Sequence, residues 1–102
     1  MADQGRQVIL GAGPIGHALH ARLVATGVEA SLWSIMGDPT YDMPGTHPEP
    51  LDGTDAEAVA AACADARVVY LLLNAHYVDW YERFPPRLEA AIVAAAAASA
   101  TL

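Results

Sequence analysis

Lysine is absent from this sequence, and its absence removes a group of reaction mechanisms. The five basic residues are all arginines and stand against 12 aspartates and glutamates, for a formal net charge of −7. The 102 residues therefore hold no lysine base and no lysine that could form a Schiff base. The arginines are scattered rather than gathered into a stripe, so we expect neither a nucleic-acid partner nor binding to an anionic membrane.

Cysteine and long hydrophobic runs are also scarce. The single cysteine, Cys63, excludes an internal disulfide and a zinc site built from cysteines. The longest biased stretch, residues 90–100, is alanine-rich and too short to span a bilayer. Residues 1–6 lead into an apolar run interrupted by glycine rather than into a signal-peptide core. We expect a cytoplasmic protein without a membrane partner.

The residues that are present predict one folded, partial α/β domain over the whole chain. Hydrophobic residues make up 54% and charged residues 17%, which disfavours disorder. Residues 7–10 form a short apolar run that ends at glycine, typical of a strand buried on both faces. A helix follows to about residue 26, with its apolar stripe on Ile15, Leu19 and Leu23, and residues 28–34 form a second strand. This unit implies two parallel strands joined by a right-handed crossover.

The second half of the chain continues the alternation of strands and helices. Its expected elements are a short edge strand at 46–51, a helix capped by Asp55 with an apolar stripe to Ala66, a strand at 68–73, a short turn or helix at 79–84, and a last helix from about Pro86. Pro85 and Pro86 are expected to separate the last two elements. The sequence therefore predicts a Rossmann-like parallel sheet in the strand order 3-2-1-4.

The main chemical signal is the motif Gly11-x-Gly13-x-x-Gly16, which lies between the first strand and its helix. Gly11 permits the tight turn, Gly13 lets a pyrophosphate approach the backbone, and Gly16 lets the helix lie close to the sheet. Pro14 and Ile15 complete the first helical turn, whose free N–H groups and dipole favour a phosphate. These five residues are therefore candidate ligands of a dinucleotide.

The choice between NAD and NADP stays open. An NAD-selective site places Asp or Glu at the end of the second strand to bind the ribose diol, and an NADP site uses arginine there. The window after that strand holds one acid, Asp38, beyond the expected strand end, and no arginine. Ser34 is compatible with either cofactor and is a candidate ligand, while Asp38 is interpreted as a turn residue before Pro39.

These residues resemble the extended and atypical short-chain dehydrogenases/reductases, the NAD-dependent epimerase/dehydratase-like proteins. The likeness is carried by the glycine motif with its flanking strands, by residues 51–55, and by residues 69–80 and 84–88. The resemblance implies that Asp52 bonds the adenine amino group. It also implies that Asn74, Ala75 and His76 pass beneath the ribose and nicotinamide of the cofactor, although simple loop packing explains His76 equally well.

The sequence departs from that family at the catalytic step. The family's Tyr-x-x-x-Lys motif lies after the next strand, and a chain without lysine cannot hold it. The resemblance therefore implies the N-terminal part of an enzyme that moves hydride between a nicotinamide and a carbinol carbon. This part ends before the fifth strand and is expected to be inactive alone. The alternative is a non-catalytic truncated scaffold or interaction module that binds no cofactor.

Further predictions concern the burial of single side chains. His17 and His20 lie three residues apart without a third metal ligand nearby, so we expect both on partly exposed helix positions and no metal site. Cys63 is expected to be an inert core thiol. The core-facing residues of the last helix are expected to be Leu88, Ala91, Ile92 and Ala95.

The apolar strand at 68–73 forms an open edge of the sheet unless something pairs with it or covers it. An unprotected apolar edge promotes aggregation. We therefore expect cover from a second copy of the chain in a homo-oligomer, from a missing C-terminal half, or from the last helix.

Overall fold

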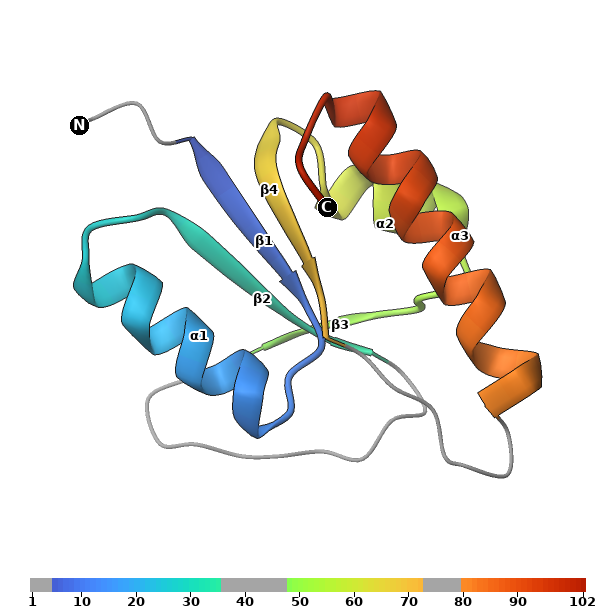
Figure 1. Cartoon of the computed structure of the whole chain (residues 1–102), viewed down its shortest axis with the longest axis horizontal. Coiled ribbons are helices and arrows are strands. Elements are labelled where there is room, and N and C mark those ends of the chain that lie inside the picture. The colour runs from blue at the N-terminus through green and yellow to red at the C-terminus, as the bar shows by residue number, and fades with distance from the viewer. Residues whose placement is uncertain (1–4, 36–47, 73–79) are drawn as a thin grey trace.

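The computed structural model of the chain describes residues 5–35, 48–72 and 80–102 (Figure 1). Its elements, in chain order, are β1 (Arg6–Leu10), α1 (Pro14–Ala25), β2 (Ala30–Ile35), β3 (Glu49–Leu51), α2 (Ala56–Ala62), β4 (Ala66–Leu71) and α3 (Trp80–Ala98). Neighbouring strands pair in parallel, and their order is β3-β2-β1-β4. The predicted Rossmann-like sheet and its strand order are confirmed.

The helices pack on the sheet in two groups. α1 contacts β1 and β2, whereas α2 and α3 contact each other and α3 contacts β4. Figure 1 shows α2 and α3 side by side. The main core lies between the sheet and this helix pair, and its buried side chains are Val8, Leu10, Ile35, Leu51, Val59, Ala62, Cys63, Ala66, Val69, Ala90, Ala91, Ala94 and Ala95. The small alanine side chains let α3 lie close to α2 and the strands.

The helix α3 runs without interruption from Trp80 to Ala98, so the predicted break at Pro85 and Pro86 is wrong. Both prolines fall in the second turn, where each removes one backbone donor close to an end of the helix. The buried face of α3 is also shifted from the predicted one. Arg87, which is 4% exposed, lies on the buried face, and Ile92, which is 48% exposed, does not.

The strand β4 begins two residues earlier than predicted, at Ala66, because the preceding helix α2 ends at Ala62. Ala66 therefore belongs to the strand rather than to the helical stripe. Asp65 between them has a φ of 62°, a left-handed conformation that aspartate adopts more readily than most residues.

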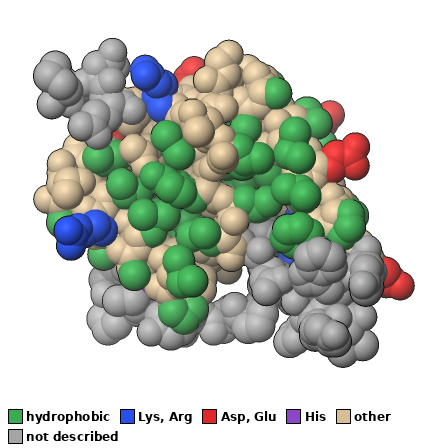
Figure 2. Space-filling view, viewed as in Figure 1, with side chains coloured by type: hydrophobic (Ala, Val, Ile, Leu, Met, Phe, Trp, Pro, Cys, Tyr) green, Lys and Arg blue, Asp and Glu red, His purple; other side chains and the backbone are tan. Residues whose placement is uncertain are grey.

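The predicted apolar stripe of α1 is wrong at its first residue. Ile15 is 71% exposed, and Leu19 and Leu23 are half-buried, whereas Gly16 and His17 are buried. The helix meets the sheet through its glycine, which turns the isoleucine outward. Figure 2 shows hydrophobic side chains on this face of the molecule, above α1 and above α3. Across the three described ranges, no helix combines the length and the apolar character that a bilayer crossing requires.

The outer edge of β4 is partly occupied by the last residues of the chain. The Thr101 carbonyl accepts a hydrogen bond from the Val69 N–H (2.7 Å), and the Thr101 N–H donates to the Arg67 carbonyl (2.9 Å). Thr101 thereby forms a parallel bridge with Val68. The residue that pairs with this edge follows α3 in the chain and is not part of that helix. A second copy or a further half of the chain as cover stays a prediction.

Candidate functional site

The glycine turn joins the end of β1 to the start of α1 through two tight geometries. Gly11 has a φ of 133°, which L-residues with a side chain rarely adopt, and its N–H donates to the Trp33 carbonyl of β2 (2.9 Å). A Cβ built on Gly16 would lie 1.9 Å from the Gly11 carbonyl oxygen and 3.4 Å from Leu32 Cδ1. Only a glycine at position 16 lets α1 begin this close to the strand.

Gly13 is different, because space rather than contact surrounds it. A Cβ built on Gly13 would meet nothing within 4 Å among the described residues. The backbone is extended there, with φ −81° and ψ −171°, so glycine is not required by conformation. A side chain at position 13 would instead block access to the backbone at the start of the helix.

The N-terminus of α1 lacks a protein cap. Gly13 is its N-cap residue and supplies no side-chain hydrogen bond, Pro14 follows directly, and the first turn contains no acidic residue. The first helical hydrogen bond runs from the His17 N–H to the Gly13 carbonyl (3.0 Å). The N–H groups of Ile15 and Gly16 precede that bond, and together with the helix dipole they form an end that favours an anion.

Ser34 lies one residue before the end of β2. It is half-buried and pairs in register with Pro50 of β3. Side chains alternate along a strand, so Ser34 shares a face of the sheet with Leu32, the residue that contacts Gly16. Its hydroxyl is therefore on the α1 side of the sheet. Asp38, interpreted from the sequence as a turn residue, falls outside the described residues.

Asp52 follows the end of β3 and is exposed. Its Oδ1 accepts hydrogen bonds from the Thr54 hydroxyl (2.7 Å) and the Thr54 N–H (3.0 Å). These hydrogen bonds lower the pKa of the Asp52 carboxyl; desolvation opposes them, and the positive charge of Arg87 adds a smaller lowering. The carboxylate is thus held ionised, and within the described part of the chain its second oxygen, Oδ2, makes no hydrogen bond, so it is available to an external donor.

The predicted residues 74–76 of the site lie outside the described residues. The Leu72 N–H donates to the Leu10 carbonyl (2.9 Å), so the chain enters this segment at the carboxyl end of β4, beside the end of β1. Asn74, Ala75 and His76 as cofactor contacts stay predictions.

The parts of the site that are described lie at one edge of the sheet. Because the strands are parallel, three groups lie at the same edge of the sheet: the glycine turn after β1, Ser34 in the last two residues of β2, and Asp52 directly after β3. Neighbouring strands are about 4.8 Å apart. An anion-binding helix end, a hydroxyl and an ionised carboxylate therefore follow one another along this edge, which is where α/β sheets bind ligands.

Two predictions about titratable side chains have different outcomes. His17 was expected to be partly exposed, yet it is 1% exposed, because it lies beside Gly16 where α1 meets the sheet. Cys63 is fully buried as predicted, and burial raises the pKa of its thiol. In the described ranges no three histidine, cysteine or acidic side chains are grouped as metal ligands would be.

Arg87 is a residue near the site that the sequence did not reveal. Its Cγ lies 3.3 Å from a Cβ built on Gly53, the residue after Asp52. From the sequence, a cofactor-binding arginine is expected only in the window after the second strand, and that window holds none. Arg87 lies 35 positions beyond Asp52 in the chain, and the fold of α3 brings it close to the turn. One sequence signal could have revealed this arginine. It stands four positions before Ala91, so it shares the helix face that was predicted to be buried.

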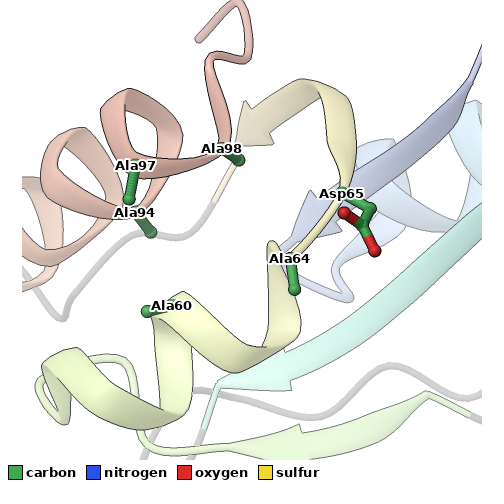
Figure 3. A pocket seen from close by; sticks show the side chains of 6 residues that line it. All are labelled: Ala60, Ala64, Asp65, Ala94, Ala97 and Ala98. Atoms are coloured by element: carbon green, nitrogen blue, oxygen red, sulfur yellow. The ribbon is translucent and has the colours of Figure 1, made fainter.

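A separate hollow of about 320 Å³ lies between α2 and α3, lined by Ala60, Ala64, Asp65, Ala94, Ala97 and Ala98 (Figure 3). Figure 3 shows the Asp65 carboxylate pointing away from the alanines of α3. Apart from Asp65, the side chains that line the hollow are alanine methyl groups.

Comparison with known proteins finds related folds among solved structures. No family model and no curated protein matches the chain. Uronate dehydrogenase from Agrobacterium tumefaciens aligns with 92% of this chain and 37% of its own, at 24% identity and a TM-score of 0.67, and a variant complexed with NAD aligns equally well. A short-chain dehydrogenase/reductase superfamily protein from the same organism with bound NAD aligns over 93% of this chain and 30% of its own, at 22% identity and a TM-score of 0.70.

This chain shares its fold with part of each of these proteins. The resemblance predicted from the sequence is thereby confirmed at the level of the fold. The chain spans about a third of the length of these enzymes.

Proposed function

We propose that this chain is an NAD(P)-binding part of a short-chain dehydrogenase/reductase, of the epimerase/dehydratase- or reductase-like kind, and is not catalytic alone. One observation carries the proposal. The N-terminus of α1 has no side-chain cap, and the glycine turn before it leaves the space around Gly13 open. The fold shared with enzymes solved with bound NAD supports it.

The order of groups along the sheet edge matches the order of groups in the adenosine half of a dinucleotide. The N–H groups of Ile15 and Gly16 would bind the pyrophosphate, with Gly11, Gly13 and Pro14 shaping the turn. Ser34 at the next strand would bond the ribose. Asp52 at the third strand would accept from the adenine amino group, because its carboxylate is exposed and ionised and the hydrogen bonds from Thr54 go to its Oδ1.

The nicotinamide half is assigned to Asn74, Ala75 and His76, which follow β4. When bound, the cofactor supplies hydride transfer to or from a carbinol carbon. These 102 residues hold no lysine and therefore no tyrosine–lysine pair of that family's kind. The chain is therefore expected to bind NAD or NADP without turning over a substrate, and its cytoplasmic location remains part of the proposal.

A second candidate is an interaction module that binds no cofactor. Apolar side chains exposed on α1 and α3 favour it, among them Ile15 (71% exposed) and Val93 (55% exposed). In this case the open helix end would be a remnant of the fold.

Titration with NADH and NADPH separates the two candidates, followed by fluorescence transfer from the two tryptophans to the dihydronicotinamide. We expect saturable binding that Gly13→Val abolishes, because the added side chain occupies the phosphate position. Ala25→Val, at the exposed far end of the same helix, is the matched control and should bind normally. Absence of binding by the unaltered chain at millimolar cofactor would favour the interaction module.

A further inference from the structure

Arg87 has an unusual place in α3. The helix buries mainly alanines, Ala90, Ala91, Ala94 and Ala95, yet the arginine beside them is only 4% exposed. Burying a guanidinium is costly, so the groups that pack around a buried arginine are informative about its role. This arginine lies at the level where α3 passes the turn that follows β3.

Gly53 shows how closely the arginine packs against that turn. A Cβ built on Gly53 would lie 3.2 Å from Ile35 Cγ2, 3.3 Å from Arg87 Cγ and 3.6 Å from Arg87 Cδ. The backbone after Asp52 is therefore held between the end of β2 on one side and the methylene stem of Arg87 on the other. Gly53 itself is buried, and a methyl group at this position would require Ile35 or Arg87 to move by a few tenths of an ångström.

The same arginine also acts on Asp52 through its charge. Thr54 makes the larger contribution to lowering the pKa of that carboxyl, and the Arg87 charge acts in the same direction. One side chain thus contacts the backbone of the turn and favours the ionised form of the carboxylate that the turn presents.

We propose that Arg87 is a positioning residue that fixes the Asp52–Gly53 turn against the end of β2, so that the Asp52 carboxylate selects a purine with an exocyclic amino group. The inference rests on the proposed dinucleotide site and adds its base selectivity. An adenine donates from its amino group to a carboxylate, whereas hypoxanthine presents a carbonyl oxygen at the same position and is repelled. Selectivity between the two bases requires a carboxylate with a fixed orientation, since a mobile carboxylate would rotate and form hydrogen bonds with water instead.

Binding of NAD and of its hypoxanthine analogue tests the proposal on the full chain. The unaltered chain should prefer NAD. Arg87→Ala, which removes the stem, should lose about tenfold in NAD affinity and most of the preference, while affinity for nicotinamide mononucleotide stays unchanged. Arg87→Met keeps an apolar stem and should lose less, and Arg87→Lys, which keeps stem and charge, should restore most of the preference.

A second measurement covers the case in which Arg87→Ala fails to fold. Carbon-detected NMR titration of the Asp52 carboxyl should show its pKa rise in Arg87→Met and return toward the original value in Arg87→Lys. An unchanged preference for NAD together with an unchanged Asp52 titration in Arg87→Met would overturn the inference while leaving the dinucleotide site intact. No saturable NAD binding by the unaltered chain would overturn the proposed function and this inference with it.

Discussion

Two of the helices that follow the carboxyl ends of the strands, α1 and α2, start in opposite ways. α2 begins after β3 with Asp55, whose side chain accepts from the N–H groups of Glu57 (3.1 Å) and Ala58 (3.2 Å). An acidic residue, Glu57, also stands in its first turn. α1 begins after β1 with Gly13, which offers no side-chain acceptor, and with no acid in its first turn.

The difference does not come from the backbone. Both N-cap residues are extended, with a φ of −81° at Gly13 and −86° at Asp55. A serine or aspartate at Gly13 would therefore have both the conformation and the space to cap α1. Relative to glycine, a cap of this kind stabilises a helix by roughly a few tenths of a kcal/mol. The N-terminus of α1 lacks this stabilisation from its own residues. An external anion can therefore bind there in place of a cap.

The largest effect is expected from filling the tightest position of α1. Gly16→Ala places a methyl group against the Gly11 carbonyl oxygen, so turn and helix must separate, at a cost of about 3 kcal/mol. Urea denaturation measures the loss. Gly13→Ala is the control, because its methyl group meets nothing within 4 Å among the described residues, and it should unfold at nearly the original urea concentration. Equal destabilisation by both changes would contradict this geometry.

Gly13→Asp converts the start of α1 into a copy of the start of α2. The new carboxylate should cap the helix and raise the free energy of unfolding by a few tenths of a kcal/mol. It should also weaken NAD binding at least about 100-fold, because the carboxylate occupies and repels the phosphate position. Thermal denaturation and NADH titration give the two values. A variant that is stabilised and still binds would show that the phosphates lie elsewhere.

The reverse change removes the cap of α2. Asp55→Ala leaves the N–H groups of Glu57 and Ala58 without their acceptor and should cost about 1 kcal/mol of stability. Dinucleotide affinity should stay within about twofold, because the capped end is not the one assigned to the phosphates. Asp55→Asn, which retains an acceptor oxygen, should recover most of the loss in urea denaturation. A large loss of affinity in Asp55→Ala would break the distinction between the two helix ends.

The smallest effect concerns the pH dependence of Asp52. Its pKa is lowered in the folded chain, so the stability it adds is present above its unfolded pKa of about 4 and is lost as the pH falls through the folded value. Thr54→Val removes the hydroxyl donor and should raise the pKa of Asp52 toward its ordinary value. NMR titration measures the shift, and urea unfolding should depend less on pH below about 4. An unmoved titration would mean that the Thr54 hydroxyl is not the main cause.

Much of the fold could be predicted from the sequence because local signals and topology agree. A glycine motif between a strand and a helix implies a parallel pair, and short connections then restrict the strand order to the one observed. The start of α2 was equally accessible, since Asp55 is a direct cap signal that needs only neighbouring residues.

The errors arise where tertiary packing overrides a local rule. Pro85 and Pro86 do not break α3, and the exposure of Ile15 and burial of His17 follow from the depth at which Gly16 brings α1 onto the sheet. The place of Arg87 near the site could not be predicted, because its neighbour Gly53 is distant in sequence and has no side chain that would indicate a contact. Periodicity identifies a buried face but says nothing about what lies opposite it.

Thr101 determines the direction in which this sheet can be extended. Because it pairs in parallel with Val68, a peptide joined to Leu102 would run along β4 toward Leu71, the end of the strand beside the glycine turn. Thr101 pairs with Val68, so residue 104 would lie opposite Leu71, and two residues added after Leu102 would reach that end. A peptide tag attached at Leu102 would extend along this sheet edge toward the carboxyl ends of the strands, where the proposed dinucleotide site lies. The amino-terminal side is the safer place for a label, since β1 starts at the opposite end of the strands.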